Sequence, residues 1–225
     1  MNWVISAIVS GISAFAATNI DDIVMLTLFF AQADDAAPTN QKSNQLRPRQ
    51  IVLGQYLGFL VLIAASIPGF VGGMIIPDPW IGLLGFLPIA IGIQQLIRPE
   101  SEEDEIQLVS DVTRSVNKNS LRAKLSQIFH PNTLQVAAVT IANGGDNIAT
   151  YVPLFASSNL SELLIILAMF GLMIALWCAI ARYLSTHPKV APLLTRYAHW
   201  IVPLVLIGLG IHILISSESY LLLQR

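Results

Sequence analysis

The sequence predicts an all-α integral membrane protein with six transmembrane helices, and three observations support this fold class. Hydrophobic residues make up 54% of the 225 residues and charged residues only 12%, and the mean hydropathy is +0.66. Apolar runs of about 20 residues, the length that crosses a bilayer as a helix, recur along the chain. Basic residues gather in alternate connections between these runs, as they do in multi-pass membrane proteins.

The apolar runs define the expected helices and leave too few residues for an ordinary soluble domain. The first run is longer than a straight crossing needs, which implies a tilt, a break or an end outside the bilayer. Turn-forming residues at 77–79 and 157–159 make the second and fourth connections short. The six expected helices comprise residues 3–31, 51–74, 80–97, 133–155, 160–184 and 200–216.

Charge asymmetry predicts the orientation of these helices. The connections after the first, third and fifth helices contain, with their flanks, eleven Lys and Arg residues, whereas the opposite side contains Arg225 alone. We therefore expect these connections in the cytoplasm and both termini outside. Trp3, Trp80 and Trp200 lie near expected helix ends, where indole rings favour the membrane interface. No Lys or Arg precedes Lys42, so the first run is expected to be a retained span rather than a signal peptide.

Polar residues interrupt the first and fourth runs at membrane depth. Residues 18–23 read Thr-Asn-Ile-Asp-Asp-Ile, and residues 142–148 read Ala-Asn-Gly-Gly-Asp-Asn-Ile. A charged Asp at the centre of a spanning helix costs roughly 2.5–3.5 kcal/mol on insertion scales. Such residues therefore predict a functional site that faces the protein interior.

The placement of the two clusters predicts an internal repeat. Each cluster lies in the first helix of one half of the chain, and three crossings per half would insert the halves in opposite directions. Transporters commonly have inverted repeats with interrupted first helices and midplane sites. We predict one membrane domain with repeats at about 1–97 and 131–216, joined by a cytoplasmic linker at about 98–130. The acidic segment 100–105 of that linker is interpreted as solvated chain, with a cation-attracting or regulatory patch as the alternative.

The clusters supply the oxygen ligands that hard cations such as Mg²⁺, Ca²⁺ or Mn²⁺ prefer. On a continuous helix Asn143, Asp146 and Asn147 would share one face, as would Asn19 and Asp22. Thr18 would reach both Asp21 and Asp22 by the same spacing. The predicted metal ligands are Asn19, Asp21, Asp22, Asn143, Asp146 and Asn147, with Thr18, Gly144 and Gly145 as secondary contributors.

Protons are the expected coupling ion. Moving two positive charges out against an inside-negative potential costs about 4.6 kcal/mol per 100 mV, so export requires a coupled ion. Adjacent helical residues diverge by about 100°, so Asp21 and Asp22 cannot both point straight at one cation. Asp22 is therefore a candidate proton carrier. His212 in the last run is a second candidate, with helix packing as its alternative role.

At these two clusters the chain resembles the cadmium-resistance transporter family (CadD-like) of the lysine-exporter (LysE) superfamily. The matching text is Ala-Thr-Asn-Ile-Asp-Asp-Ile at 17–23 and Ala-Asn-Gly-Gly-Asp-Asn-Ile at 142–148. The resemblance implies a six-span transporter of two three-helix repeats in a bacterial inner (plasma) membrane, which moves divalent metal outward and is not an enzyme. It leaves the metal open among Cd²⁺, Mn²⁺, Mg²⁺ and Ca²⁺, because Cd²⁺ is soft whereas the available ligands are hard.

Two other functions remain as alternatives. Amino-acid efflux fits the wider superfamily, but Arg182 is the only basic residue within the runs that could hold a substrate carboxylate. An intramembrane aspartyl protease would use Asp21 and Asp146 as its dyad. Asn143, however, replaces the first Gly of the Gly-x-Gly-Asp motif of those enzymes, and Ile20 replaces the expected Tyr.

Composition narrows the expected partners. A net charge of -2 without a basic stripe argues against nucleic acid. The single cysteine, Cys178, excludes an internal disulfide framework and a Cys-rich metal cage. No Walker-type phosphate loop is present in the sequence. We expect no cofactor, a divalent metal ion and protons as substrates, a lipid bilayer as the surroundings, and compatibility with a homo-oligomer.

Overall fold

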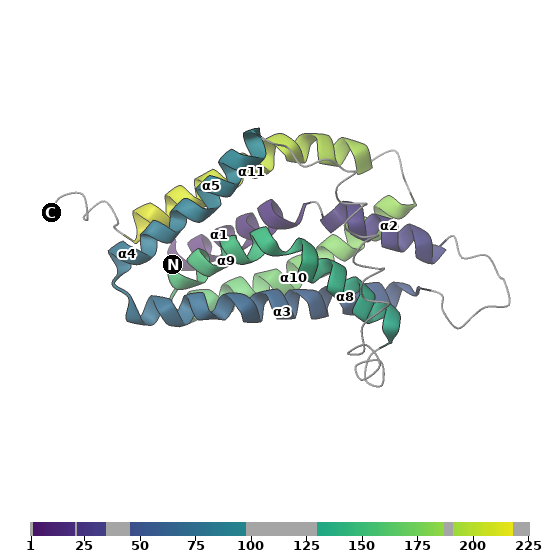
Figure 1. Ribbon diagram of the computed structural model, residues 1–225, viewed down its shortest axis with the longest axis horizontal. Helices are drawn as coiled ribbons and strands as arrows, with labels where there is room; N and C mark the ends of the chain where they lie inside the picture. The colour runs from purple at the N-terminus through teal and green to yellow at the C-terminus, as the bar shows by residue number, and fades with distance from the viewer. Residues whose placement is uncertain (1, 21, 35–45, 98–129, 187–190, 218–225) are drawn as a thin grey trace.

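A computed structural model describes residues 2–20, 22–34, 46–97, 130–186 and 191–217, and every regular element in these ranges is a helix (Figure 1). The all-helical fold class is thus confirmed for the described part of the chain. The elements are α1 (Asn2–Asn19), α2 (Asp22–Asp34), α3 (Pro48–Ile75), α4 (Asp78–Gly82), the 3-10 helix η1 (Leu83–Gly85), α5 (Phe86–Ile97), α8 (Pro131–Asn143), α9 (Gly145–Ala156), α10 (Leu160–Ser185) and α11 (Ala191–Ser216). The acidic segment 100–105 and most of the predicted linker lie outside the described residues.

Three helical stretches within the described residues are long and apolar enough to cross a membrane. They are α3, the stretch Trp80–Ile97 that runs from α4 through α5, and α10. A fourth is added if α1 and α2, which lie at 63° to each other, count as one bent span. The described apolar stretch Pro203–Ser216 of α11 is shorter. Six crossings therefore remain a prediction.

Helix ends in the described chain follow local sequence signals. Asn159 precedes α10, and its side chain accepts a hydrogen bond from the Glu162 amide at 3.0 Å. The Glu162 carboxylate accepts a hydrogen bond from the backbone N–H of Asn159, also at 3.0 Å, and this second bond completes a capping box. α9 ends at Ala156, so the short fourth connection is confirmed.

The fourth predicted helix is broken in its polar cluster. α8 ends at Asn143 and α9 begins at Gly145, so Asn143, Asp146 and Asn147 do not share the face of one continuous helix. That part of the prediction was wrong because two adjacent glycines each weaken a helix by about 1 kcal/mol relative to Ala. Asp146 also favours the start of a new helix, because its carboxylate accepts a hydrogen bond from the backbone N–H of Asn147 at 2.9 Å in the first turn of α9.

Each broken helix packs along a long helix from the other half of the chain. α3 runs parallel to α8 and α9, since Gly54 lies against Thr133 near the start of both and Gly73 lies against Ala156 near their ends. α10 runs parallel to α1 in the same way, with Ile166 against Gly11 and Trp177 against Asn19. Figure 1 shows α3 beside α8 and α9, and α10 between α1 and α3.

The last helices of the two halves, α5 and α11, pack against each other. α5 and α11 lie side by side at the top of Figure 1. They run antiparallel, because Gly85 lies against Gly210 and Gly92 against Pro203. The contact is reciprocal: a Cβ added to Gly85 would lie 2.5 Å from the Gly210 carbonyl oxygen, and one added to Gly210 would lie 2.3 Å from that of Gly85. The two backbones therefore touch directly.

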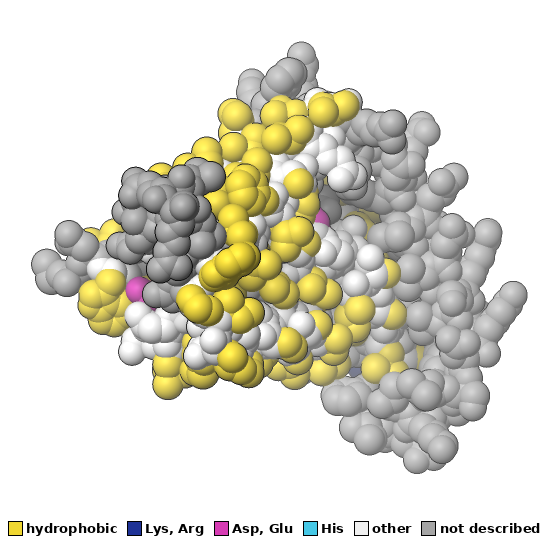
Figure 2. Space-filling view, turned by 60° about the vertical axis from the view of Figure 1, so that its left-hand side comes forward, with side chains coloured by type: hydrophobic (Ala, Val, Ile, Leu, Met, Phe, Trp, Pro, Cys, Tyr) yellow, Lys and Arg dark blue, Asp and Glu magenta, His cyan; other side chains and the backbone are white. Residues whose placement is uncertain are grey.

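The core is aromatic, and the outer surface is apolar. Phe15, Phe59, Phe170 and Tyr151 are almost completely buried and pack against one another beside the ends of α1 and α8. The face in Figure 2 is mostly hydrophobic, with few charged side chains among the described residues. Large apolar side chains are exposed along α3, α5, α10 and α11. Exposed apolar side chains of this kind fit contact with lipid.

Candidate metal site

Asp22 is the centre of a buried hydrogen-bond network that joins three helices. It begins α2, and only 2% of the residue is exposed. Its Oδ1 accepts a hydrogen bond from the Asn143 amide group of α8 at 2.9 Å, and its Oδ2 accepts one from the Gln55 amide group of α3 at 2.8 Å. A carboxylate away from water needs such donors, and charged acceptors make the stronger hydrogen bonds.

Gln55 is held in turn by Thr140. The Thr140 hydroxyl lies 2.7 Å from Gln55 Oε1 and 3.1 Å from the Val136 carbonyl oxygen. Because Gln55 Oε1 accepts from Thr140, its amide nitrogen is directed at Asp22. The side chain thus has one orientation that satisfies both neighbours.

Asn19 is the centre of a second buried hydrogen-bond network, where α1 ends. Its Nδ2 lies within 2.7–2.9 Å of the Phe15 carbonyl oxygen, the Thr18 hydroxyl and the Tyr151 hydroxyl, which share its two hydrogens. Its Oδ1 accepts from Asn147 Nδ2 at 3.0 Å. The indole N–H of Trp177 donates to the Asn19 carbonyl at 2.5 Å, so α10 satisfies a carbonyl that the helix break leaves free.

Two buried oxygens on α9 have no hydrogen-bond partner within the described residues. They are Asn147 Oδ1 and Thr150 Oγ1, on residues that are 2% and 0% exposed. The side-chain amide of Asn147 cannot flip, because a flip would remove its hydrogen bond to Asn19 Oδ1. The orientation of the Asn19 side chain is itself fixed, because its Nδ2 donates to the Phe15 carbonyl. An oxygen that is desolvated and unpaired is costly, and a bound cation would satisfy it.

The structure brings together predicted residues from both halves of the chain. Asn19 bonds Asn147, and Asp22 bonds Asn143. Asp21 lies outside the described residues, so the full ligand set remains a prediction. Among the described residues no group of three or more His, Cys, Asp and Glu could hold a metal, so a metal site here would combine the Asp22 carboxylate with amides, hydroxyls and Asp21.

The remaining predicted residues have different surroundings. Thr18 donates to the Ala14 carbonyl at 3.0 Å and pairs with the Tyr151 hydroxyl at 3.1 Å. The expectation that it reaches Asp22 along one helix was wrong, because α1 ends before Asp22. Gly144 packs so closely on Leu62 that an added Cβ would lie 2.4 Å from its methyl carbons, whereas Gly145 faces open space.

Tyr151 is the residue of this network that sequence reasoning missed, together with the specific roles of Gln55, Thr140 and Trp177. Tyr151 is fully buried and bonds both Thr18 and Asn19. A helical spacing of four residues after Asn147 could have indicated its position. Nothing in the sequence indicates that Trp177 reaches the end of α1, because that contact joins helices far apart in the chain.

The family to which the chain belongs can be determined by comparison with known proteins. A family model described as a cadmium resistance transporter matches residues 15–224, which include both polar clusters. The chain belongs to the cadmium resistance transporter family. No curated protein and no solved structure matches it significantly. Membership of this family means that the chain is an integral membrane transporter with a metal ion substrate. Its long apolar helices agree with a location in the membrane.

In this member of the cadmium resistance transporter family, Gln55→Leu is expected to lower stability. The change removes the amide that donates to Asp22 Oδ2, and losing a buried hydrogen bond to a charged group costs roughly 1–3 kcal/mol. For a chain of this size that corresponds to a fall of about 2–12 °C in melting temperature, measurable in detergent. Gln94→Leu, which removes an exposed amide from α5, is the control and should change the melting temperature little. Equal melting temperatures for both variants would contradict the role assigned to Gln55.

Proposed function

We propose that the chain is a secondary transporter that exports divalent metal cations in exchange for protons, through a site between its two broken helices. The observation that supports this most strongly is the pair of hydrogen bonds Asn19–Asn147 and Asp22–Asn143. They join polar residues from the two halves of the chain at the helix breaks, inside an otherwise apolar protein. Broken helices that meet around buried oxygens are typical of cation sites in transporters.

The proposed architecture is six crossings arranged as two inverted repeats. The reciprocal packing supports it, because each broken helix runs along the second long helix of the other half. The same sequence offset separates Asn19 from Gly144, Asp22 from Asn147 and Gly85 from Gly210. The first two pairs lie at the two helix breaks, and the third is the reciprocal glycine contact. Charge asymmetry supports an orientation with the termini outside and the long connections in the cytoplasm.

In the proposed mechanism the site residues supply oxygen ligands and negative charge to a cation. Asp22 supplies the charge that a divalent ion requires in a low dielectric. Asn147 Oδ1 and Thr150 Oγ1 are unpaired among the described residues and are available as ligands. The Asn143 amide presents its nitrogen to Asp22, and rotation of this amide would present its oxygen to a cation instead. Asp21, two residues after Asn19, completes the proposed set.

The coupling ion follows from energetics. Export of two charges against an inside-negative potential costs about 4.6 kcal/mol per 100 mV, and proton entry in exchange can supply it. Asp22 is the proposed proton carrier, because a carboxylate that binds a metal and a proton alternately couples the two movements. Amino-acid efflux gains no support: the Arg182 guanidinium lies 5.6 Å from the centre of the Phe30 ring, which is eight residues after Asp22 in α2.

Transport in reconstituted vesicles tests this function. Vesicles containing the protein and a pH-sensitive dye would be offered Cd²⁺, Mn²⁺, Mg²⁺, Ca²⁺ and Zn²⁺ with an imposed pH gradient. We expect accumulation of at least one of these ions with proton movement in the opposite direction, and loss of accumulation when a protonophore collapses the gradient. Protein-free vesicles are the control. If none of the five ions moves, or if movement ignores the pH gradient, the proposed exchange is wrong.

A further inference from the structure

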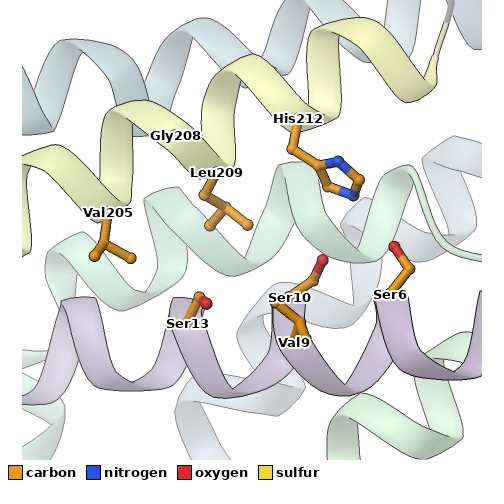
Figure 3. A pocket seen from close by; sticks show the side chains of 8 residues that line it. All are labelled: Ser6, Val9, Ser10, Ser13, Val205, Gly208, Leu209 and His212. Carbon is orange, nitrogen blue, oxygen red and sulfur yellow. The ribbon is translucent and has the colours of Figure 1, made fainter.

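A second polar region lies between α1 and α11, apart from the network around Asp22. A cavity of about 330 Å³ occupies this space (Figure 3). Its polar lining consists of Ser6, Ser10 and Ser13 from α1 and His212 from α11. Thr18 and Asn19, by contrast, point from α1 toward Tyr151 of α9. The cavity therefore uses a different face of α1 from the candidate metal site.

The serines of this cavity differ from the other hydroxyl residues in the apolar helices. Thr18, Thr27 and Ser66 each donate to the carbonyl four residues earlier, the usual way to satisfy a hydroxyl in such a helix. Ser6, Ser10 and Ser13 make no hydrogen bond to any described residue. Ser10 is only 8% exposed, and in Figure 3 its hydroxyl is directed toward the side where His212 lies. Three hydroxyls and an imidazole thus face one cavity and need partners from outside the protein.

Water satisfies these groups, and a lipid tail does not. An acyl chain offers no hydrogen bond, and burying a hydroxyl without a partner costs about 1–3 kcal/mol on the scale of protein mutations. A polar cavity of this size with several donors and acceptors is the kind that holds ordered water. The same groups can contact the hydration shell of a metal ion.

An apolar cluster lies at the deep end of this cavity. Ala17 and Leu206 are 3% and 0% exposed and form a small core of their own, separate from the main one, against which Ile20 and Ile91 pack. Val205 belongs to both the cluster and the cavity lining. Ala17 follows the cavity-lining Ser13 by one turn of α1, and Ile20 comes directly after the end of α1, so the cluster lies between the cavity and the helix break. Hydrophobic constrictions of this kind close aqueous paths by excluding water.

We propose that the α1–α11 cavity is an aqueous vestibule for hydrated divalent cations, closed from the metal site by a gate of Ala17, Ile20, Ile91, Val205 and Leu206. This inference rests on the proposed function for the identity of the ion. The vestibule lies toward the start of α1, the end of the protein that charge asymmetry assigns to the outside. Movement of α11 away from α1 at Leu206 would join the vestibule to Asn19 and Asp22.

Thiol labelling tests the vestibule without requiring transport. Ser10→Cys, Ser13→Cys and Leu204→Cys would each be made in the full-length chain with Cys178→Ala, and treated in vesicles with a membrane-impermeant thiosulfonate. Leu204 is 62% exposed on α11 and serves as the lipid-facing control. We expect Ser10→Cys and Ser13→Cys to react at least about tenfold faster than the control, because thiosulfonates react with thiolates that water can solvate. Rates equal to that of Leu204→Cys would mean a lipid-filled cavity and overturn the proposal.

The gate has its own variants. Ala17→Cys should react at least about tenfold more slowly than Ser13→Cys, and adding Leu206→Ala should remove most of this difference, because it takes away the largest buried gate side chain. If Ala17→Cys reacts as fast as Ser13→Cys while Leu206 is intact, there is no gate. Folding of each variant is checked by size-exclusion chromatography, and Ser13→Cys alone decides the vestibule if Ser10→Cys fails to fold. Normal labelling without any metal transport would leave the vestibule standing and refute the proposed function.

Discussion

Asp22→Asn is expected to abolish metal transport while leaving a folded protein. The variant keeps the size of the side chain and one oxygen that can accept from Gln55 or Asn143. It removes the negative charge that would offset a divalent cation in a low dielectric. Because 1.4 kcal/mol already changes an equilibrium tenfold, we expect metal uptake by vesicles to fall by at least about 100-fold. The loss of one charged hydrogen bond should lower the melting temperature only modestly.

Glu162→Gln is the matched control for this variant. Glu162 is a carboxylate in the capping box of α10, where it accepts from the Asn159 amide, away from the network around Asp22. Its replacement removes the same charge from the chain and should leave uptake within about twofold of wild type, since surface interactions of this kind are worth little. Retained transport in Asp22→Asn, or equal losses in the two variants, would show that Asp22 does not bind the transported ion.

Gly73→Leu should prevent correct folding, whereas Gly72→Leu should be tolerated. A Cβ on Gly73 would lie 2.1 Å from the Ala156 carbonyl oxygen, closer than real Cβ atoms approach, and the obstacle is backbone rather than a flexible side chain. A Cβ on Gly72 meets only the Ile76 side chain at 3.9 Å. Overpacking typically costs about 1–3 kcal/mol, and here α9 would have to move away from α3. Because α9 contains Asn147, the displacement would also separate Asn147 from Asn19.

The yield of monodisperse protein in detergent measures this difference directly. We expect the yield of Gly73→Leu to be at least about tenfold below that of Gly72→Leu, since 1.4 kcal/mol corresponds to a factor of ten. Both substitutions add the same apolar side chain to neighbouring positions of one helix, so insertion into the membrane should not differ. Equal yields would mean that α3 and α9 are not packed through Gly73.

Much of the site could be predicted from single residues because buried charge and amides stand out against an apolar chain. Asn19, Asp22, Asn143 and Asn147 were predicted as ligands from two separate segments, and the structure places them in direct contact. The repeated position of the clusters in each half also indicated that they would meet. Whether they bind a metal, and with what contribution from Asp21, remains a prediction.

Other parts of the site depend on packing that one sequence does not reveal. Because the helix is interrupted at Gly144, Asn143 lies at the end of α8 and Asp146 at the start of α9. Their sequence spacing therefore no longer predicts that they share one helix face. Trp177 and Gln55 entered the network because α10 and α3 lie against the helix breaks, which follows from glycine contacts between distant segments. The sequence alone does not reveal the role of Tyr151, because that role depends on hydrogen bonds to Thr18 and Asn19 of another helix.

The exchange of packing partners between the two halves has a consequence for biosynthesis. The glycine-lined groove of α3 is filled by α8 and α9, which leave the ribosome only after the first half has been made. Residues 1–97 alone would therefore present bare backbone and the side-chain oxygen of Gln55, whose partner Thr140 belongs to the second half, to their surroundings until translation ends. Lipid or an insertase would therefore have to cover these exposed groups until the second half of the polypeptide has been made and packs against them.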